Sequence, residues 1–396
     1  LDEMVSRTPA ARDRYVDFLR AVSILAVVFG HWFIALIVWR RGVIAVYSAV
    51  GVTSGLWLAT WVFQVIPVFF FVGGFSNATS YDAAMRRGIG TATFLRSRAE
   101  RLLKPTAIFL GSWLVIELVL HILDRGGTGL VRGVRLRSTL PFGPLWFLAV
   151  YLGIVMLSPL TSRLHHRYRL SIPFVLVAIA VLVDVLAFAA DVPHIRWVNL
   201  AVVWSLAHQL GYFYADGSLI RAGRGAHLAM VLLGLVALVG LTSLGAYPRS
   251  MLGTDATFFH LKAIERVSNM NPPTFCIVAL TFWLIGLAML ARGPVTRWLQ
   301  RPGAWKAVIA MNGVIMTLFL WHMTAYALAI LILFPPGFGH ALDSTARWWA
   351  ERPLWEVVPG AILFALVAVL GRFERPASPP PSGRSHAEST RQAAAP

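Results

Sequence analysis

The sequence predicts an all-α polytopic membrane protein of about ten transmembrane helices, with both termini in the cytoplasm. Of its 396 residues 57% are hydrophobic, and the mean hydropathy is +0.68. The apolar residues gather in runs close to the roughly 20 residues that cross a bilayer as a helix. We expect one transmembrane domain over residues 1–371. A disordered cytoplasmic tail rich in Pro, Ser and Ala is expected over 372–396.

The apolar runs place the ten expected helices at 17–39, 57–79, 105–123, 144–160, 171–190, 197–215, 228–246, 273–291, 307–334 and 355–371. With the N-terminus inside, the cytoplasmic segments carry 22 Lys and Arg residues and the outer segments carry 12. Positive residues favour the cytoplasmic side, so this bias orients the chain. Pro67 in the second helix, and Pro141 and Pro144 at the start of the fourth, predict kinks or irregular helix ends.

The formal net charge of +17 invites comparison with nucleic-acid-binding proteins. The basic residues fall mainly between apolar runs, however, which is typical of membrane topology, so we expect no nucleic-acid partner. The single cysteine, Cys276, lies in an apolar run, which argues against disulfides, zinc fingers and a cysteine nucleophile. His165 and His166 are adjacent, which suits a solvated loop better than a metal site, and we expect no metal. His208 and Gln209 are expected to form hydrogen bonds between helices.

The first apolar run, 17–39, carries three ionisable side chains, Asp17, Arg20 and His31. On a helix, eleven residues bring His31 back to within roughly 20° of the face of Arg20 and place it roughly 16 Å deeper. Asp17 is on the same face and can pair with Arg20. Ionisable groups inside a membrane are usually functional. Two simpler interpretations remain open, namely that Arg20 is a positive-inside anchor and that His31 bonds a neighbouring helix.

The densest group of basic residues follows the second helix and consists of Arg96, Arg98, Arg101 and Lys104. On a helix several of these side chains would lie on one side. Guanidinium groups bind phosphates in a bidentate manner, so the group could hold a phosphorylated ligand. The alternative is an ordinary positive-inside loop.

The run Ser268–Thr274 resembles one in actinobacterial members of the acyltransferase-3 family of integral-membrane O-acyltransferases, and four short motifs together resemble that family. They are Arg20 and His31 with ten residues between them, Arg98-Ala99-Glu100-Arg101, Pro144-Leu145-Trp146-Phe147-Leu148 and Leu320-Trp321-His322. The resemblance covers most of residues 13–335. It implies a protein of a bacterial plasma membrane that moves an acetyl or other short acyl group. Cytoplasmic acyl-CoA would be the donor, and a hydroxyl of an envelope glycan or glycolipid, for which we name a trehalose mycolate, would be the acceptor.

The resemblance also gives the candidate residues their roles. His31 is expected to be the general base or to be acylated transiently, helped by Arg20, Asp17 and His322. The CoA phosphates are expected on Arg98, Arg101, Arg96 and Lys104. The acceptor is expected near Trp146, Tyr151 and Tyr326, and near Asn271 in the long outer loop 247–275, whose polar residues suit sugar recognition.

Two other classes of function compete with the enzyme. A transporter or exporter of a lipid-linked or anionic envelope precursor would also hold Arg and His residues within about ten helices. Such proteins often have internally repeated halves, and the sequence contains no matching pair of interrupted helices. The long outer loop and the tail are the features that would suit a scaffold among envelope-assembly proteins.

Overall fold

A computed structural model describes residues 12–40, 43–125, 135–136, 140–245, 247–252, 268–341 and 345–371. Within these ranges, nine helical segments are long and apolar enough to cross a membrane. The main helices are α2 (Arg14–Phe33), α3 (Trp57–Phe63), α4 (Ile66–Arg86), α5 (Thr91–Arg125), α6 (Leu145–Tyr168), α7 (Ser171–Phe188), α8 (Val198–Ala215), α10 (Gly223–Ser243), α12 (Phe275–Trp298), α13 (Pro302–Asn312), α14 (Ile315–Leu333) and α15 (Ala346–Leu370). The predicted all-α membrane fold is confirmed.

Short elements complete the chain: strands β1 (Ala35–Arg40), β2 (Val43–Ser48) and β3 (Arg135–Leu136), helix α9 (Ser218–Arg221), and the 3-10 turns η1 (Ala49–Gly51), η2 (Leu140–Phe142) and η3 (Ile195–Trp197). The helix expected over 197–215 is α8. It is less apolar than the nine candidate spans because it carries Asn199, His208 and Gln209, and most of its residues are buried by neighbouring helices. The tail expected over 372–396 lies outside the described residues.

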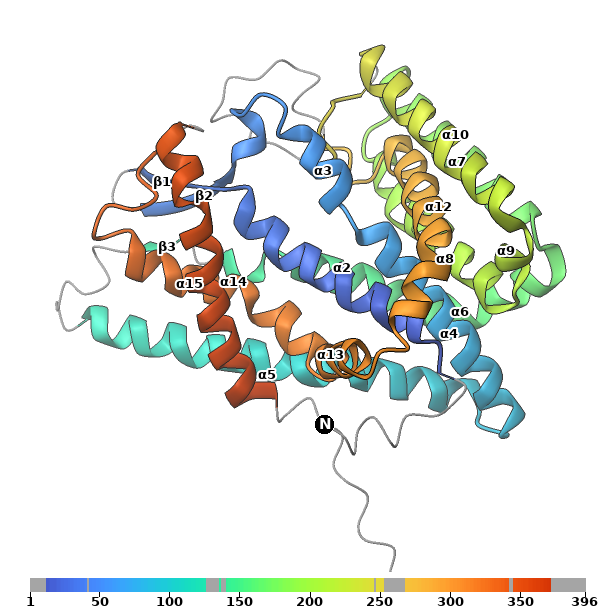
Figure 1. Cartoon of the computed structure of the whole chain (residues 1–396), viewed down its shortest axis with the longest axis horizontal. Coiled ribbons are helices and arrows are strands. Elements are labelled where there is room, and N and C mark those ends of the chain that lie inside the picture. Colours follow the sequence, from blue (N-terminus) through green and yellow to red (C-terminus); the bar gives the residue numbers. More distant parts are fainter. Residues whose placement is uncertain are drawn as a thin grey trace, which may run out of the picture.

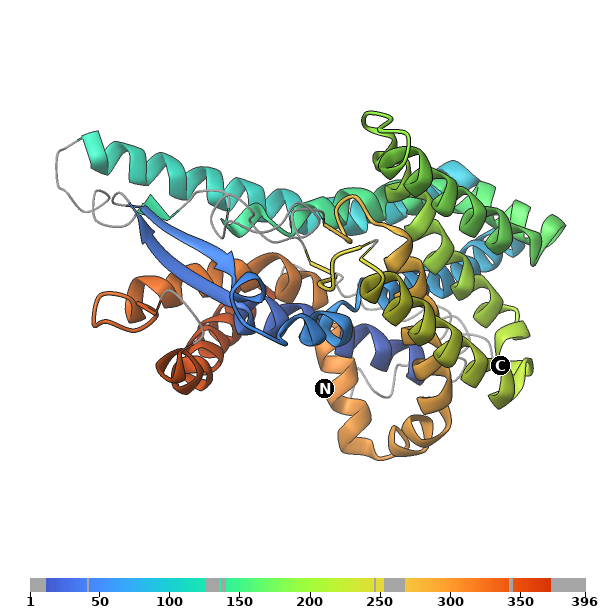
Figure 2. The same cartoon turned by 90° about the horizontal axis from the view of Figure 1, so that it is seen from above.

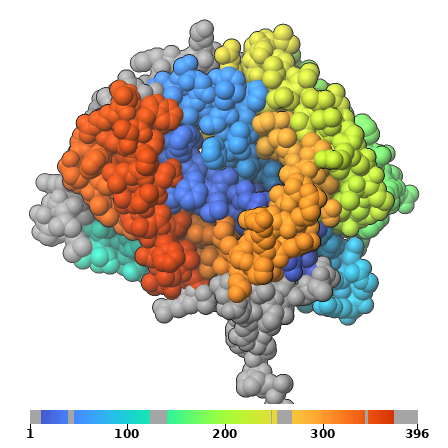
Figure 3. Space-filling model, viewed as in Figure 1, coloured from blue at the N-terminus to red at the C-terminus, as the bar shows by residue number. Residues whose placement is uncertain are grey.

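Helix α2 lies at the centre of the molecule (Figure 1). It contacts α4, α12, α13, α14 and α15 along its length and α3 at its C-terminal end. In the space-filling view α2 forms the floor of a hollow framed by α3, α12, α13 and α15 (Figure 3). The candidate residues of the first apolar run therefore occupy the centre of the helix bundle.

The first helix is shorter than predicted. It ends at Phe33, and residues 35–40 form β1, which pairs antiparallel with β2 from Ala35 opposite Ser48 to Arg40 opposite Val43. Figure 2 shows the two strands of this hairpin lying side by side. Residues 35–39 are all apolar, and three of them have branched side chains. Because polar and apolar residues do not alternate here, the pattern does not distinguish a strand from a helix. The Arg352 side chain of α15 donates to the Ala35 carbonyl at 3.0 Å and so ties the hairpin to the bundle.

Interruptions divide two of the predicted helices. The second separates into α3 and α4 at residues 64–65, just before Pro67, where an irregular segment was expected. The ninth separates into α13 and α14 at Gly313 and Val314, a break that the apolar pattern did not indicate. In contrast, α5 continues through Pro105, so the basic residues before it lie on a helix and not in a loop.

Two of the expected polar contacts between helices are present, and one histidine was misplaced. His208 of α8 lies 3.0 Å from the Asn77 amide of α4, and Gln209 lies 2.7 Å from the Nδ1 atom of His165. His165 was predicted in a solvated loop, which is wrong. Helix α6 extends to Tyr168, so His165 is buried between Gln209 and Asp216, while His166 is exposed.

Helices α4 and α8 cross at two glycines in close contact. A Cβ atom at Gly211 would lie 2.1 Å from the backbone oxygen of Phe71, and one at Gly74 would lie 1.9 Å from that of His208. Small residues allow membrane helices to approach in this way. We expect Gly211→Ala to destabilise the fold by about 3 kcal/mol, because backbone has to move. Thermal unfolding in detergent measures this loss.

The matched control is Gly153→Ala on α6, where an added Cβ meets no atom within 4 Å. It should unfold at the temperature of the parent protein. Equal unfolding temperatures for the Gly211 and Gly153 variants would show that the α4–α8 contact is not close-packed.

Candidate functional site

The N-terminal end of α2 positions the first group of functional side chains. Asp13 caps the helix by accepting hydrogen bonds from the backbone nitrogens of Tyr15 and Val16. The next turn carries Asp17, which is buried and accepts from Arg12 and, at 3.2 Å, from Arg20. The predicted Asp17–Arg20 pair is therefore present. It holds the guanidinium of Arg20 at the wall of an internal cavity.

This cavity is strongly basic, and we call it the basic cavity. Four guanidinium groups line it, from Arg12, Arg20, Arg98 and Arg101, and no Asp or Glu is among its described lining residues. Arg20 also donates to Ser76 Oγ at 2.6 Å, and its NH1 lies 3.4 Å from Asn312 Oδ1. The cavity is therefore suited to a multiply charged anion, because arginine remains charged and presents paired donors to phosphate.

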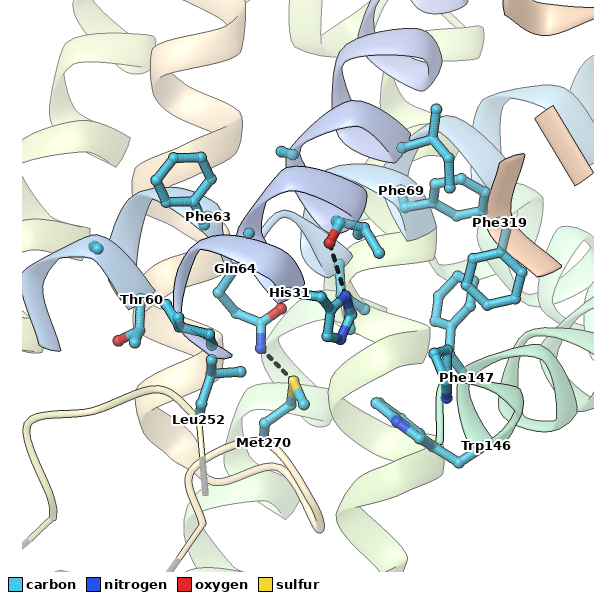
Figure 4. Close-up of a pocket in the computed structure, with 18 residues that line it drawn as sticks. His31, Thr60, Phe63, Gln64, Phe69, Trp146, Phe147, Leu252, Met270 and Phe319 are labelled. Carbon is cyan, nitrogen blue, oxygen red and sulfur yellow. Dashed lines mark hydrogen bonds between the residues drawn. The ribbon is translucent and has the colours of Figure 1, made fainter. Parts of the chain in front are cut away.

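His31 lies at the other end of α2, in a second cavity that we call the outer cavity (Figure 4). Its Nδ1 atom lies 2.7 Å from the Val27 carbonyl. A carbonyl only accepts, so Nδ1 carries the hydrogen and the Nε2 atom of the neutral ring keeps its lone pair. The side chain is exposed to the cavity, between Gln64 and Met270 on one side and Trp146 on the other. His31 is thus able to accept a proton.

A second histidine stands next to the first. The rings of His31 and His322 have centroids 5.2 Å apart. His322 is fully buried on α14, its Nδ1 lies 2.6 Å from the Phe319 carbonyl, and its Nε2 has no hydrogen-bond partner among the described residues. Trp32 of α2 donates to the backbone oxygen of His322 at 3.2 Å and fixes the two helices together. The pair therefore presents two imidazoles of the same tautomer.

The two cavities meet at a common wall. Four residues line both of them: Ile24 on α2, Phe69 on α4, Phe147 on α6 and Phe319 on α14. Ile24 lies between Arg20 and His31 along α2. The basic group and the imidazole therefore lie on opposite sides of one apolar wall made of these four side chains.

The structure separates the other predicted site residues into three groups. Trp146 lines the outer cavity, whereas Tyr151 lines the basic one. Arg96 is exposed and bonded to Glu100, and Lys104 is also exposed; neither lines the cavity that holds Arg98 and Arg101. Tyr326 packs against Trp355, and Asn271 lies in an exposed turn, so neither lines a described cavity. The charged residues between 253 and 267 of the long outer loop lie outside the described residues.

Sequence reasoning did not assign a role to several of the lining residues. Arg12 precedes the first apolar run by five residues and reaches back to Asp17, which the pattern of the run could not indicate. Gln64 is a polar side chain at the break between α3 and α4, and its place within an apolar stretch was the signal that could have drawn attention to it. Ser76 and Asn312 reach Arg20 from distant helices, so their role depends on tertiary packing.

A family model described as an acyltransferase domain matches residues 13–372, which is nearly the whole chain. No curated protein and no solved structure matches the chain. The matched span contains every residue named in this section except Arg12, which lines the basic cavity and directly precedes the span.

Proposed function

The chain belongs to the acyltransferase-3 family and is a multi-pass membrane acyltransferase, and we propose that it moves a short acyl group from cytoplasmic acyl-CoA to an envelope glycolipid or glycan. One observation carries this proposal. A cavity lined by four arginines and a cavity holding His31 share a single wall along α2. A donor bound by its phosphates on one side would then present its thioester to a base on the other.

The donor fits the basic cavity by charge and shape. Coenzyme A carries a pyrophosphate and a 3′-phosphate at one end of a long flexible arm that ends in the thioester. Arg98 and Arg101 would bind the phosphates, and Arg20, held by Asp17, would guide the arm. Tyr151, which was predicted to be near the acceptor, lines the basic cavity and would instead help to bind the donor. Arg96 and Lys104 belong to the surrounding positive surface and not to the pocket. We place this cavity on the cytoplasmic face of a bacterial plasma membrane.

The reaction needs a base at the outer cavity. The acceptor hydroxyl gives its proton to the Nε2 atom of His31 as its oxygen attacks the thioester carbonyl. The new ester forms, the carbon–sulfur bond breaks, and the CoA thiolate takes the proton from His31 as it leaves towards the basic cavity, so that the imidazole is neutral again. In a two-step form of the reaction, the same nitrogen first accepts the acyl group itself. In that form the Nε2 atom of His322, which has no hydrogen-bond partner among the described residues, would take the proton of the attacking hydroxyl and pass it on to the CoA thiolate.

The acceptor would approach through the outer cavity. Its walls are mostly apolar, with His31, Thr60 and Gln64 as the polar groups and Trp146 as an aromatic surface on which a sugar ring could pack. Such a lining suits an amphiphile better than a free sugar, so we favour a glycolipid such as a trehalose mycolate. Envelope-assembly proteins are the expected partners.

Purified protein in liposomes with labelled acetyl-CoA and envelope glycolipids tests the proposal. We expect the label to appear on the glycolipid, and envelope lipids from a deletion strain to lack the acetyl-sized mass increment. A transporter would instead move an unmodified precursor across the liposome membrane without consuming acetyl-CoA, and that result would contradict the proposal.

A further inference from the structure

The wall between the two cavities is made of aromatic rings in mutual contact. The centroids of Phe69 and Phe147 lie 5.1 Å apart, and those of Phe147 and Phe319 lie 5.6 Å apart, both in edge-to-face geometry. Ile24 completes the ring from α2. Figure 4 shows Phe69, Phe147 and Phe319 gathered on one side of His31. We call these four residues the collar.

The collar is supported by a second layer of rings. Phe147 also packs against Phe70 at 5.5 Å and is stacked on Tyr151 at 5.9 Å. Phe70 is itself stacked on Trp204 at 5.1 Å. Phe147 and Phe319 are each only 7% exposed, so neither ring can turn without disturbing a neighbour. The partition is therefore stiff at Phe147 and Phe319.

We propose that this collar is a size-selecting partition that decides which acyl groups reach His31. The inference rests on the proposed function, because a donor held by Arg98 and Arg101 has to pass its thioester through the collar to reach the imidazole. A slender unbranched chain passes when the half-buried ring of Phe69 tilts. A branched acyl group has to displace two packed rings together, which close packing resists.

The first test compares acetyl-CoA with isobutyryl-CoA as donors. One extra methylene changes discrimination in an apolar site by about 10-fold or more. We therefore expect Phe147→Ala and Phe319→Ala to raise the isobutyryl-to-acetyl ratio of kcat/KM at least about 10-fold. Phe147→Leu, a milder change, should raise it less.

Phe213→Ala is the matched control, because Phe213 of α8 is about as buried as Phe147 and Phe319 but lines neither cavity. Its donor ratio should equal that of the parent. An unchanged ratio in all three collar variants, or an equal rise in the Phe213 variant, would overturn the proposal.

The second test does not depend on transfer. In a Cys276→Ser background, Ala59→Cys places a thiol in the outer cavity and Ser76→Cys places one in the basic cavity. A membrane-impermeant maleimide added to intact cells should label only one of the two proteins. Adding Phe147→Ala should allow the other to be labelled as well.

The two tests fail in different ways. Labelling of both cysteines from the same side in the presence of an intact collar would overturn the partition, even if acyl transfer is normal. Absence of any transfer by the parent protein, together with one-sided labelling, would instead contradict the proposed function and leave the partition intact.

Discussion

Replacing His31 with alanine should abolish acyl transfer while the protein still folds and inserts. The imidazole is exposed to the outer cavity, and its Nδ1–H bond to Val27 leaves Nε2 as the acceptor. Loss of a general base costs about 10²- to 10⁴-fold in rate, and loss of a nucleophile costs at least as much. The measurement is single-turnover transfer of labelled acetyl by purified His31→Ala, with a size-exclusion profile to show that the variant is folded.

A histidine outside both cavities provides the control. His227 is buried on α10, and its Nε2 donates to the Leu219 carbonyl. It therefore has a structural role and lines neither cavity. His227→Ala should retain transfer within a few-fold of the parent. Parental rates in His31→Ala would defeat the assignment of the base. Equal losses in the two variants would show that the effect of His31→Ala is a general one on the fold.

Much of the fold could be predicted because the bilayer imposes a length on each apolar run. Helices α7, α8 and α12 begin within two residues of their predicted starts. The errors occur where the length of an apolar run does not determine the structure. A strand such as β1 and a helix end such as that of α2 can share one apolar run, and the break between α13 and α14 carries no proline to mark it.

The sequence could predict the arrangement of site residues only where they belong to one helix. Arg20 and His31 belong to one helix, so eleven residues of spacing were enough to place both on one stripe. The resemblance of Leu320-Trp321-His322 to a family motif brought in His322, but its contact with His31 depends on the packing of α14 against α2. The collar takes one residue from each of four helices. No spacing within one segment indicates such a contact.

Replacing Arg98 and Arg101 together with alanine should raise the KM for acetyl-CoA by about 100-fold. Both guanidinium groups line the basic cavity, and a hydrogen bond to a charged group contributes about 1.5–3 kcal/mol, so two of them account for at least that factor. The kcat measured at saturating donor should change much less, because His31 and the collar lie on other helices. Initial rates over a wide range of acetyl-CoA concentration separate the two parameters.

Two other basic residues of α5 provide the control that distinguishes direct binding of the donor from general electrostatic attraction. Arg96→Ala with Lys104→Ala removes the same formal charge from α5, but neither of these side chains lines the basic cavity. General attraction of an anion to a positive surface would make the two double variants alike and would fade as salt screens it. Direct binding would leave the KM of the Arg96 and Lys104 variant within a few-fold of the parent, whereas equal shifts in both pairs would remove Arg98 and Arg101 from the donor site.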